Sequence, residues 1–156
     1  MLSFLKKKDD HVVAPVSGKC IRIEEVPDEV FSSKMMGDGF AVIPEGDTVA
    51  APVSGEITMI PDLKHAFGLK TRTGIELLVH IGLDTVNLQG QGFTVLAKQG
   101  SKIRAGEPVI RVDKEFMEKQ GINLTTIVIF TEGYKQEVEL EFFGQQVKLG
   151  DVLLEN

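Results

Sequence analysis

One five-residue segment occurs twice in this chain of 156 residues, and this repeat constrains the fold more than any other feature. Ala14-Pro15-Val16-Ser17-Gly18 recurs unchanged as Ala51-Pro52-Val53-Ser54-Gly55. Each copy leads into a run with strand character, Lys19 to Ile23 and Glu56 to Ile60. A repeat of this kind indicates that one supersecondary unit is used more than once in a shared core.

A second element, a glycine followed by an acidic residue and then apolar residues, also repeats. It occurs as Gly46-Asp47-Thr48-Val49, Gly106-Glu107-Pro108-Val109 and Gly150-Asp151-Val152-Leu153. Neither repeated element carries chemistry in itself, so both are interpreted as architectural.

Short runs with strand character lie between these turns, and Gly, Pro or Asp bounds most of them. The further runs are His11–Val16, Phe40–Pro44, Ala66–Lys70, Ile75–Ile81, Pro108–Val112, Thr126–Phe130, Glu137–Glu141 and Asp151–Leu154. One segment, Lys114 to Gln120, is typical of a helix, with Asp113 as its N-cap and Gly121 as its stop. The sequence predicts an all-β fold, an antiparallel β-sandwich or squashed barrel with one or two short helices. We expect one domain over residues 11–156, after a flexible tail over residues 1–10.

Composition narrows the function classes. The net charge of −6 argues against nucleic acid as the main partner, because phosphate binding needs a basic face. The single cysteine, Cys20, excludes an intrachain disulfide and a cysteine-based metal cluster. No apolar stretch approaches the roughly 18 residues of a membrane span, and the apolar part of residues 1–10 is too short for a signal peptide. We therefore expect a cytoplasmic protein with at most peripheral membrane contact through its first residues.

Two of the three histidines, His65 and His80, lie on a predicted hairpin. A two-residue turn at Arg72-Thr73 places His65 directly opposite His80, and Phe67 opposite Leu78 on the same face. Directly opposed residues of antiparallel strands have Cβ atoms about 4.5–5.5 Å apart, so both imidazoles could reach one bound group. A bulge in the turn would shift this register by one residue.

Strand alternation places His80 with Leu78 on a shallow apolar surface. A neutral imidazole nitrogen is a competent nucleophile near pH 7, and a second imidazole, that of His65, could donate a hydrogen bond to a transferred phosphoryl group. Two other interpretations stay open for the pair. The histidines could be hydrogen-bonded structural residues, or zinc ligands, although two further ligands at suitable spacing are absent from the sequence. His11 stands alone and is assigned no role.

The segment Gly74-Ile75-Glu76-Leu77-Leu78-Val79-His80-Ile81-Gly82-Leu83-Asp84-Thr85-Val86 resembles the active-site signature of the glucose-type enzyme IIA of the bacterial phosphoenolpyruvate-dependent sugar phosphotransferase system. Similar segments of that family match Val26-Pro27-Asp28, Phe31, Met35-Met36-Gly37-Asp38-Gly39, Ala51-Pro52-Val53 and His65-Ala66-Phe67. The order and spacing agree from about residue 11 to the end.

The resemblance implies a β-sandwich of the duplicated-hybrid-motif type and a phosphotransferase activity. It implies that His80 accepts a phosphoryl group from the phosphocarrier protein HPr, and passes it to a cysteine on the IIB domain of a permease for glucose-class sugars. His65 matches the second active-site histidine, which helps to hold the group. No cofactor is required, although some members bind zinc between this pair and a partner's carboxylate, and some regulate other proteins.

The resemblance also implies a partner-binding surface. Acidic residues flank the site and would attract a basic carrier face, whereas apolar residues form the docking surface. The implied partner-binding residues are Asp28, Phe31, Met35, Met36, Phe67, Leu78, Gly82 and Asp84. Core packing is the alternative for the five apolar ones. Leu63 stands where members of the family often carry a hydroxylated residue, so a hydroxyl contact to His65 is not expected.

Three alternative functions require different features of the sequence. A regulatory binding module could use the same apolar face without phosphoryl transfer. A zinc peptidase would need a His-x-His pair, and Gly82 occupies the position where the second histidine would stand. A biotin or lipoyl carrier would need a characteristic lysine context that is absent around Lys34. The sugar, the permease and the oligomeric state are not specified by these residues.

Overall fold

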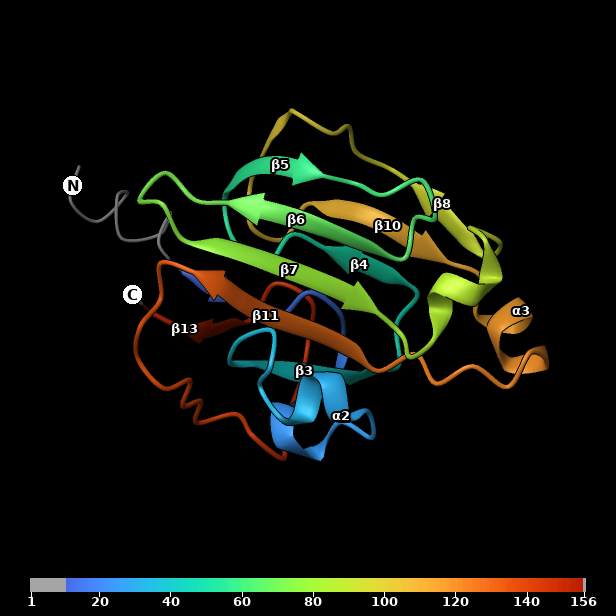
Figure 1. Cartoon of the computed structure of the whole chain (residues 1–156), viewed down its shortest axis with the longest axis horizontal. Coiled ribbons are helices and arrows are strands. Elements are labelled where there is room, and N and C mark those ends of the chain that lie inside the picture. The colour runs from blue at the N-terminus through green and yellow to red at the C-terminus, as the bar shows by residue number, and fades with distance from the viewer. Residues whose placement is uncertain (1–10, 156) are drawn as a thin grey trace.

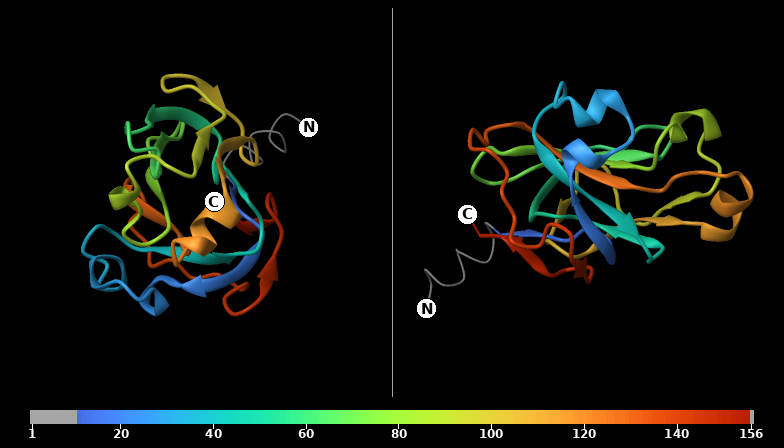
Figure 2. Two further views of the ribbon diagram at one scale, coloured as in Figure 1. Left: turned by 90° about the vertical axis from the view of Figure 1, so that its right-hand side faces the viewer. Right: turned by 90° about the horizontal axis from the view of Figure 1, so that it is seen from below.

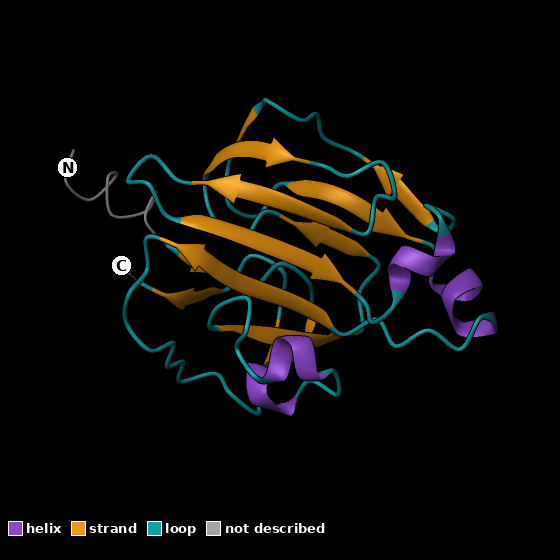
Figure 3. Ribbon diagram, viewed as in Figure 1, coloured by secondary structure: helices purple, strands orange, loops and turns teal. Residues whose placement is uncertain are grey.

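Antiparallel strands dominate the computed structural model, which describes residues 11–155 (Figures 1 and 3). The strands are β1 (Val12–Val13), β2 (Gly18–Arg22), β3 (Gly39–Pro44), β4 (Thr48–Ala50), β5 (Gly55–Met59), β6 (Ala66–Lys70), β7 (Glu76–Ile81), β8 (Phe93–Val95), β9 (Lys102–Ile103), β10 (Pro108–Val112), β11 (Thr126–Glu132), β12 (Gln146–Val147) and β13 (Val152–Leu154). The helices are α2 (Glu29–Ser32) and α3 (Lys114–Lys119), with 3-10 turns η1 (Ile23–Glu25) and η2 (Thr85–Leu88). The tail predicted over residues 1–10 lies outside the described residues.

The strands form three sheets, and every strand pair in the described part of the chain is antiparallel. The largest has the order β12-β2-β3-β11-β7-β6-β5-β9, and β4-β10-β8 and β1-β13 form the smaller ones. The large sheet lies in front of β4, β8 and β10 in Figure 1, and it curls around the core in the end-on view of Figure 2. The all-β sandwich prediction is confirmed.

The large sheet is built from two equivalent halves. Its order pairs β12 with β9, β2 with β5, β3 with β6 and β11 with β7 about its centre. At that centre β7 and β11 are neighbours, and Val79 is paired with Val128. The two halves therefore correspond residue by residue. Gly18, which is paired with Pro44, corresponds to Gly55, which lies opposite Thr71. The pair Lys19–Ile43 likewise corresponds to the pair Glu56–Lys70.

Backbone and hydroxyl contacts of the two repeat copies match bond for bond, as the repeat predicted. Each copy's serine accepts from the turn that contains the second repeated element, and each copy's first residue exchanges two bonds with that turn. The serine bonds are Leu149 N–H to Ser17 Oγ in the first copy and Ala105 N–H to Ser54 Oγ in the second, both 2.9 Å. The first residue of each copy accepts from Gly150 N–H (to Ala14 O, 2.9 Å) or from Gly106 N–H (to Ala51 O, 2.8 Å). It also donates, from Ala14 N–H to Asp151 O (2.8 Å) or from Ala51 N–H to Glu107 O (2.9 Å). The copies also cross, through Val13 N–H to Pro52 O and Ala50 N–H to Pro15 O, both 2.7 Å.

Apolar side chains gather in two clusters on opposite faces of the large sheet. The main core lies inside the sandwich and includes Phe40, Phe67 and Val79. The second, smaller cluster lies on the outer face, under η1 and α2. It consists of Ile21, Ile23, Val26, Phe31, Ala41, Ile127 and Ile129. Alternation along β3 and β11 sends neighbouring residues to the two clusters, so the outer face near α2 is apolar and covered.

Most predicted elements are present. The strands Ala66–Lys70 and Pro108–Val112 have the predicted bounds, and the predicted helix begins at Lys114 and ends one residue early at Lys119. Asp113 caps that helix by accepting a hydrogen bond from Phe116 N–H (3.0 Å), and Gly121 follows with a φ of 69°.

The strand predicted at Glu137–Glu141 is wrong. Val138 and Leu140 are buried, so the alternation that suggested a strand is real. However, the N–H of Val138 donates to Asp38 Oδ2 (2.9 Å) rather than to a neighbouring strand. Alternating burial therefore identified the inward residues but not a ladder partner. No helix in the described part of the chain is long and apolar enough to cross a membrane.

Candidate functional site

The hairpin that carries the two histidines has a register one residue from the predicted one. His80 is paired with Ala66, and Phe67 with Val79. The connection is a three-residue loop rather than the predicted two-residue turn, because Gly74 adopts a φ of 95°. A loop of this kind, with glycine in the left-handed region, adds one residue to one side of the hairpin.

The two histidine rings nevertheless meet. His65 precedes the first residue of β6, and its carbonyl accepts a hydrogen bond from Ile81 N–H (2.8 Å). The ring centroids of His65 and His80 are 5.1 Å apart, and the ring planes are nearly perpendicular at 82°. The strand pairing ends at this point, and Lys64 has a φ of 62°, so the ring of His65 is placed by the end of the strand rather than by strand alternation.

The shifted register removes Phe67 from the predicted docking surface. Phe67 is fully buried in the main core, because its partner Val79 faces inward. The prediction that it shares a face with Leu78 is therefore wrong. Leu78 is paired with Gly68 and packs, half-buried, against the second cluster. Leu78 thus remains on the same face as His80.

The backbone after β7 fixes the protonation pattern of the His80 ring. Nδ1 lies 2.9 Å from the carbonyl oxygen of Gly82, which can only accept, so Nδ1 carries the hydrogen. The neutral ring then holds its lone pair on Nε2. Gly82 has a φ of 81°, and a Cβ there would lie 2.5 Å from Thr85 Cγ2. Glycine is therefore required for the turn that aims this carbonyl.

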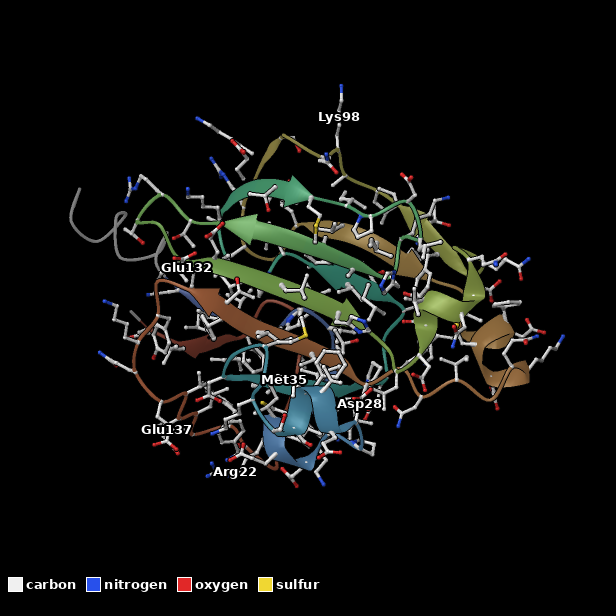
Figure 4. All side chains as sticks on the ribbon, in the orientation of Figure 1. Arg22, Asp28, Met35, Lys98, Glu132 and Glu137 are labelled. Atoms are coloured by element: carbon white, nitrogen blue, oxygen red, sulfur yellow. The ribbon has the colours of Figure 1, made fainter. Side chains whose placement is uncertain are left out.

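Helix α2 forms the second wall of the site. Asp28 caps it by accepting a hydrogen bond from Val30 N–H (3.0 Å). The ring of Phe31 lies 4.9 Å from the His80 ring, centroid to centroid, with an interplanar angle of 52°. Phe31 is itself buried in the second cluster, so it supports the imidazole from below rather than standing exposed. Asp28 and Met35 lie on either side of α2, in front of the large sheet (Figure 4).

Both imidazoles favour the neutral form. Burial lowers the pKa of His80 below its ordinary value of 6.5, and the neighbouring His65 lowers it further. The Gly82 carbonyl and the carboxylates of Asp28 and Asp84 oppose this shift. Burial also lowers the pKa of His65. A neutral His80 with its lone pair on Nε2 is a nucleophile, which is the form that phosphoryl acceptance needs.

His65 Nδ1 is buried without a hydrogen-bond partner. An unpaired buried N–H donor costs more than an unpaired acceptor, so the favoured neutral form has its hydrogen on Nε2. That hydrogen is then available to a group bound beside His80. No group of three His, Cys, Asp or Glu side chains that could hold a metal ion occurs within residues 11–155.

Two of the predicted docking residues carry exposed apolar side chains. The side chain of Met35 is 77% exposed and that of Met36 is 40% exposed, so both predicted docking residues lie on the surface. Asp84 is exposed too, in the left-handed region with a φ of 58°. Val30 on α2 and Val86 on η2 are also exposed apolar residues, at 46% and 45%, and the sequence analysis did not single them out. Val86 lies within the signature segment and Val30 next to Phe31, so proximity in sequence was the available signal.

Comparisons with known proteins agree with this arrangement. A sequence model of the family described as phosphoenolpyruvate-dependent sugar phosphotransferase system, EIIA 1, matches residues 10–136. The glucose-specific EIIA component of Mycoplasma capricolum is 41% identical over 146 residues, 94% of either chain. That of Halalkalibacterium halodurans is 44% identical over 147 residues, covering 94% of this chain and 85% of that one.

Longer relatives contain the same region. The glucoside-specific EIICBA component of Staphylococcus carnosus is 42% identical over 143 residues, covering 92% of this chain and 20% of that protein. The chain thus spans about a fifth of the length of this relative and, at 21%, of the glucose-specific EIICBA component. The solved structure of glucose permease IIA from Mycoplasma capricolum superimposes with a TM-score of 0.82 at 41% identity, covering 92% of either chain.

Proposed function

Because the chain belongs to the EIIA 1 family of the phosphoenolpyruvate-dependent sugar phosphotransferase system, as the resemblance predicted, we propose that Nε2 of His80 accepts and releases the phosphoryl group. Members of this family are the phosphocarriers of that system, and the chain is such a phosphotransferase component. The observation that carries the proposal is the 2.9 Å contact between His80 Nδ1 and the Gly82 carbonyl, which leaves the lone pair on Nε2.

The proposed step is a displacement at phosphorus. The Nε2 lone pair forms the new N–P bond, and the bond from phosphorus to the donor atom of phospho-HPr breaks with its electron pair left on the donor. The hydrogen on Nδ1 stays there throughout and remains donated to the Gly82 carbonyl. In the second step a cysteine thiolate of a IIB domain attacks phosphorus, and the N–P electron pair returns to Nε2. Such a loose transition state needs mainly positioning and charge stabilisation.

His65 would stabilise the transferred group. A phosphoryl group brings roughly 1.5 to 2 negative charges near neutral pH. The hydrogen on His65 Nε2 can be donated to one of its oxygens, and a nearby dianion would raise the pKa of His65 from its lowered value. We therefore propose that His65 is needed more for holding and passing on the group than for accepting it.

The proposed partners are HPr and the IIB domain of a permease for glucose-class sugars, in the cytoplasm. Fusion of this region within EIICBA relatives supports the IIB partner. Met35, Met36, Val30 and Val86 supply an adaptable apolar surface, and Asp28 and Asp84 an acidic rim for a basic carrier. Regulatory protein targets would dock on the same surface.

We propose that transfer needs no cofactor. The histidine pair offers two nitrogen ligands to zinc, which usually takes four, so a partner's carboxylate would have to complete such a site. For His65 to be a ligand through Nε2, its hydrogen would have to move to the buried Nδ1, which has no acceptor. Zinc would then compete with phosphorylation by occupying Nε2 of His80.

Intact-mass analysis after incubation with phosphoenolpyruvate, enzyme I and HPr tests the proposal. One acid-labile phosphoryl group is expected on the wild type and on the control His11→Gln, and none on His80→Gln. His65→Gln should accept the group but pass it on roughly ten- to a hundredfold more slowly, as for loss of one stabilising donor. Phosphorylation of His80→Gln would refute the assignment. No uptake by the wild type would favour the regulatory binding module.

A further inference from the structure

An open cleft of about 710 Å³ lies at the end of the hairpin remote from the histidines. It is formed where β6 ends, β5 begins and β9 passes beside β5, on the side of the β6–β7 turn in Figure 1. The lining residues are Ser54, Gly55, Glu56, Lys70, Thr71, Arg72, Lys102, Ile103, Arg104 and Glu107. The volume is in the range of pockets that hold small molecules.

Positive charge is concentrated in this cleft, although the whole chain carries a net charge of −6. Four basic side chains line it, those of Lys70, Arg72, Lys102 and Arg104, against two carboxylates. All four are exposed, and none is within 4.0 Å of a carboxylate in the described residues. Their hydrogen-bond donors are therefore available to a ligand.

The two carboxylates leave this charge only partly balanced. Glu107 accepts a hydrogen bond from the backbone N–H of Arg104 (2.8 Å), so it serves the repeated turn. Glu56 is paired across the sheet with Lys70 on one side and Lys102 on the other, and one carboxylate cannot neutralise both. The hydroxyl of Ser54 accepts from Ala105 N–H (2.9 Å), and its own hydrogen remains free to donate into the cleft.

The first repeat copy shows that the framework does not require these charges. Strand pairing makes Ile43 the counterpart of Lys70, and Gln146 the counterpart of Lys102. Lys19 stands in the place of Glu56, and Lys148 in that of Arg104. The same backbone bonds are thus made at both places, but Lys70 and Lys102 are replaced by uncharged side chains in the first copy. Architecture accounts for the turn and the serine, and it leaves the basic side chains unexplained.

We propose that this cleft binds a small phosphate-bearing anion. Guanidinium groups such as those of Arg72 and Arg104 bind phosphate oxygens in pairs, and the two lysines add point charges. Glu56 can accept from hydroxyl groups of the same ligand, which favours a phosphorylated polyol over phosphate alone. The chemistry is shared by a free phosphate ester and by a lipid headgroup.

The cleft is independent of the phosphoryl site. From His65 to Lys70 the hairpin arm extends for about 16 Å, at about 3.3 Å per residue. A ligand in the cleft therefore cannot contact Nε2 of His80, and variants of the cleft should still be phosphorylated. Failure of the phosphoryl transfer proposal would leave this inference intact, and the reverse also holds.

NMR titration of the full chain with glucose 6-phosphate, inorganic phosphate and glucose tests the free-ligand source. We expect saturable shifts of the backbone amides of residues 54–56, 70–72 and 102–104 with the phosphate ester, and none with glucose. Arg104→Gln should weaken binding at least about tenfold, as for loss of a charge-assisted contact. Lys148→Gln removes the same charge from the counterpart position and should weaken it less than about twofold.

Vesicle sedimentation tests the headgroup source, with phosphatidylglycerol vesicles against phosphatidylcholine vesicles. Binding only to the anionic vesicles, lost in Arg104→Gln and kept in Lys148→Gln, would support the proposal with a lipid as the source. Absence of binding in both assays would overturn it. Equal weakening by Arg104→Gln and Lys148→Gln would also overturn it, because the attraction would then be that of charge alone.

Discussion

The two halves of the large sheet share one backbone plan but differ at the positions where chemistry occurs. His80 is paired with Ala66 in one half, and the corresponding pair in the other half is Ile129 with Gly39. Ile129 is fully buried, whereas His80 is half-buried at the edge of the apolar surface. Asp38 corresponds to His65 and accepts from Gly39 N–H (2.8 Å) and Val138 N–H (2.9 Å), a structural role.

The difference arises from the connection before each central hairpin. Residues 23–38 join β2 to β3 and form η1 and α2, which cover Ile129. Residues 60–65 join β5 to β6 and are too short to cover the other half in the same way. One insertion therefore buries one half and gives the other a wall, through Phe31, against which an imidazole can rest. The two halves therefore share a backbone plan, but only one of them leaves its central residue accessible.

Exchanging His80 and Ile129 tests most directly whether the two halves differ in function. His80→Ile should lose phosphoryl acceptance by more than about a thousandfold, since the nucleophile itself is removed. Ile129→His should gain no acceptance, because a buried imidazole at that place has no route to a partner. Phosphorylation measured by intact mass, with circular dichroism to confirm folding, would check both. Acceptance by the double variant His80→Ile/Ile129→His would show that the two halves are interchangeable.

Glycine substitutions measure how equivalent the repeat copies are. A Cβ at Gly18 would lie 2.1 Å from Ile43 O, and one at Gly55 would lie 2.2 Å from Lys70 O. Because backbone oxygens cannot move aside cheaply, Gly18→Ala and Gly55→Ala should each lower the free energy of unfolding by about 3 kcal/mol or more. Urea denaturation measures this loss. In the control Gly46→Ala, the new Cβ would have no atom nearer than 3.7 Å, so the loss should stay below about 1 kcal/mol. Losses that differ strongly between Gly18→Ala and Gly55→Ala would count against equivalent halves.

The imidazole half should also be the pH-sensitive half. The pKa of His80 is lowered on folding, so the unfolded chain binds the proton more readily. The contribution of the neutral His80 to the free energy of unfolding is therefore fully present above pH 6.5, and it is lost as the pH falls from 6.5 through the lowered pKa. NMR titration of the ring should place the His80 pKa below 6.5, and His65→Gln should raise it, since His65 contributes to the lowering. A His80 pKa that is unchanged in His65→Gln would show that the rings do not interact.

The smallest expected effect concerns the acidic rim. Asp28→Asn and Asp84→Asn should each slow acceptance from HPr by about two- to fivefold at low salt, and the difference should shrink as ionic strength rises. Asn at position 28 can still cap α2, so the fold should be unaffected. Glu132→Gln, at the end of β11 remote from Asp28 in Figure 4, is the matched control. Rates that do not depend on salt would remove the steering role and leave the chemistry unchanged.

Local signals in the sequence predicted much of the fold. The repeat predicted two equivalent units, and short runs with strand character predicted β6 and β10 with their bounds. The two-residue strands β9 and β12, and the four-residue helix α2, are too short to produce a periodic pattern. They exist because partners distant in sequence hold them, which residue patterns do not encode.

The site was predicted in its composition more than in its geometry. The proximity of His65 to His80 is confirmed, but for a different reason from the one expected. The hairpin register depended on the φ of Gly74, which the sequence allows but does not determine. Because of this one residue the register differs from the predicted one, and Phe67 lies in the core rather than on the expected surface. The Nδ1 contact to Gly82 is likewise made by backbone, which leaves no signature in side-chain identity.

The carbonyl of Gly82 has a consequence for anyone who wishes to transplant this chemistry. The N–H of Gly82 donates to Thr125 O (3.0 Å), and this bond helps to fix the direction of the Gly82 carbonyl. The tautomer of His80 therefore depends on the end of β7, on the turn at Gly82 and on the segment around Thr125. Placing two histidines on another hairpin would copy the side chains but not the backbone contact that sets the His80 tautomer. The portable unit is the strand end, its glycine turn and the neighbouring strand that anchors the turn.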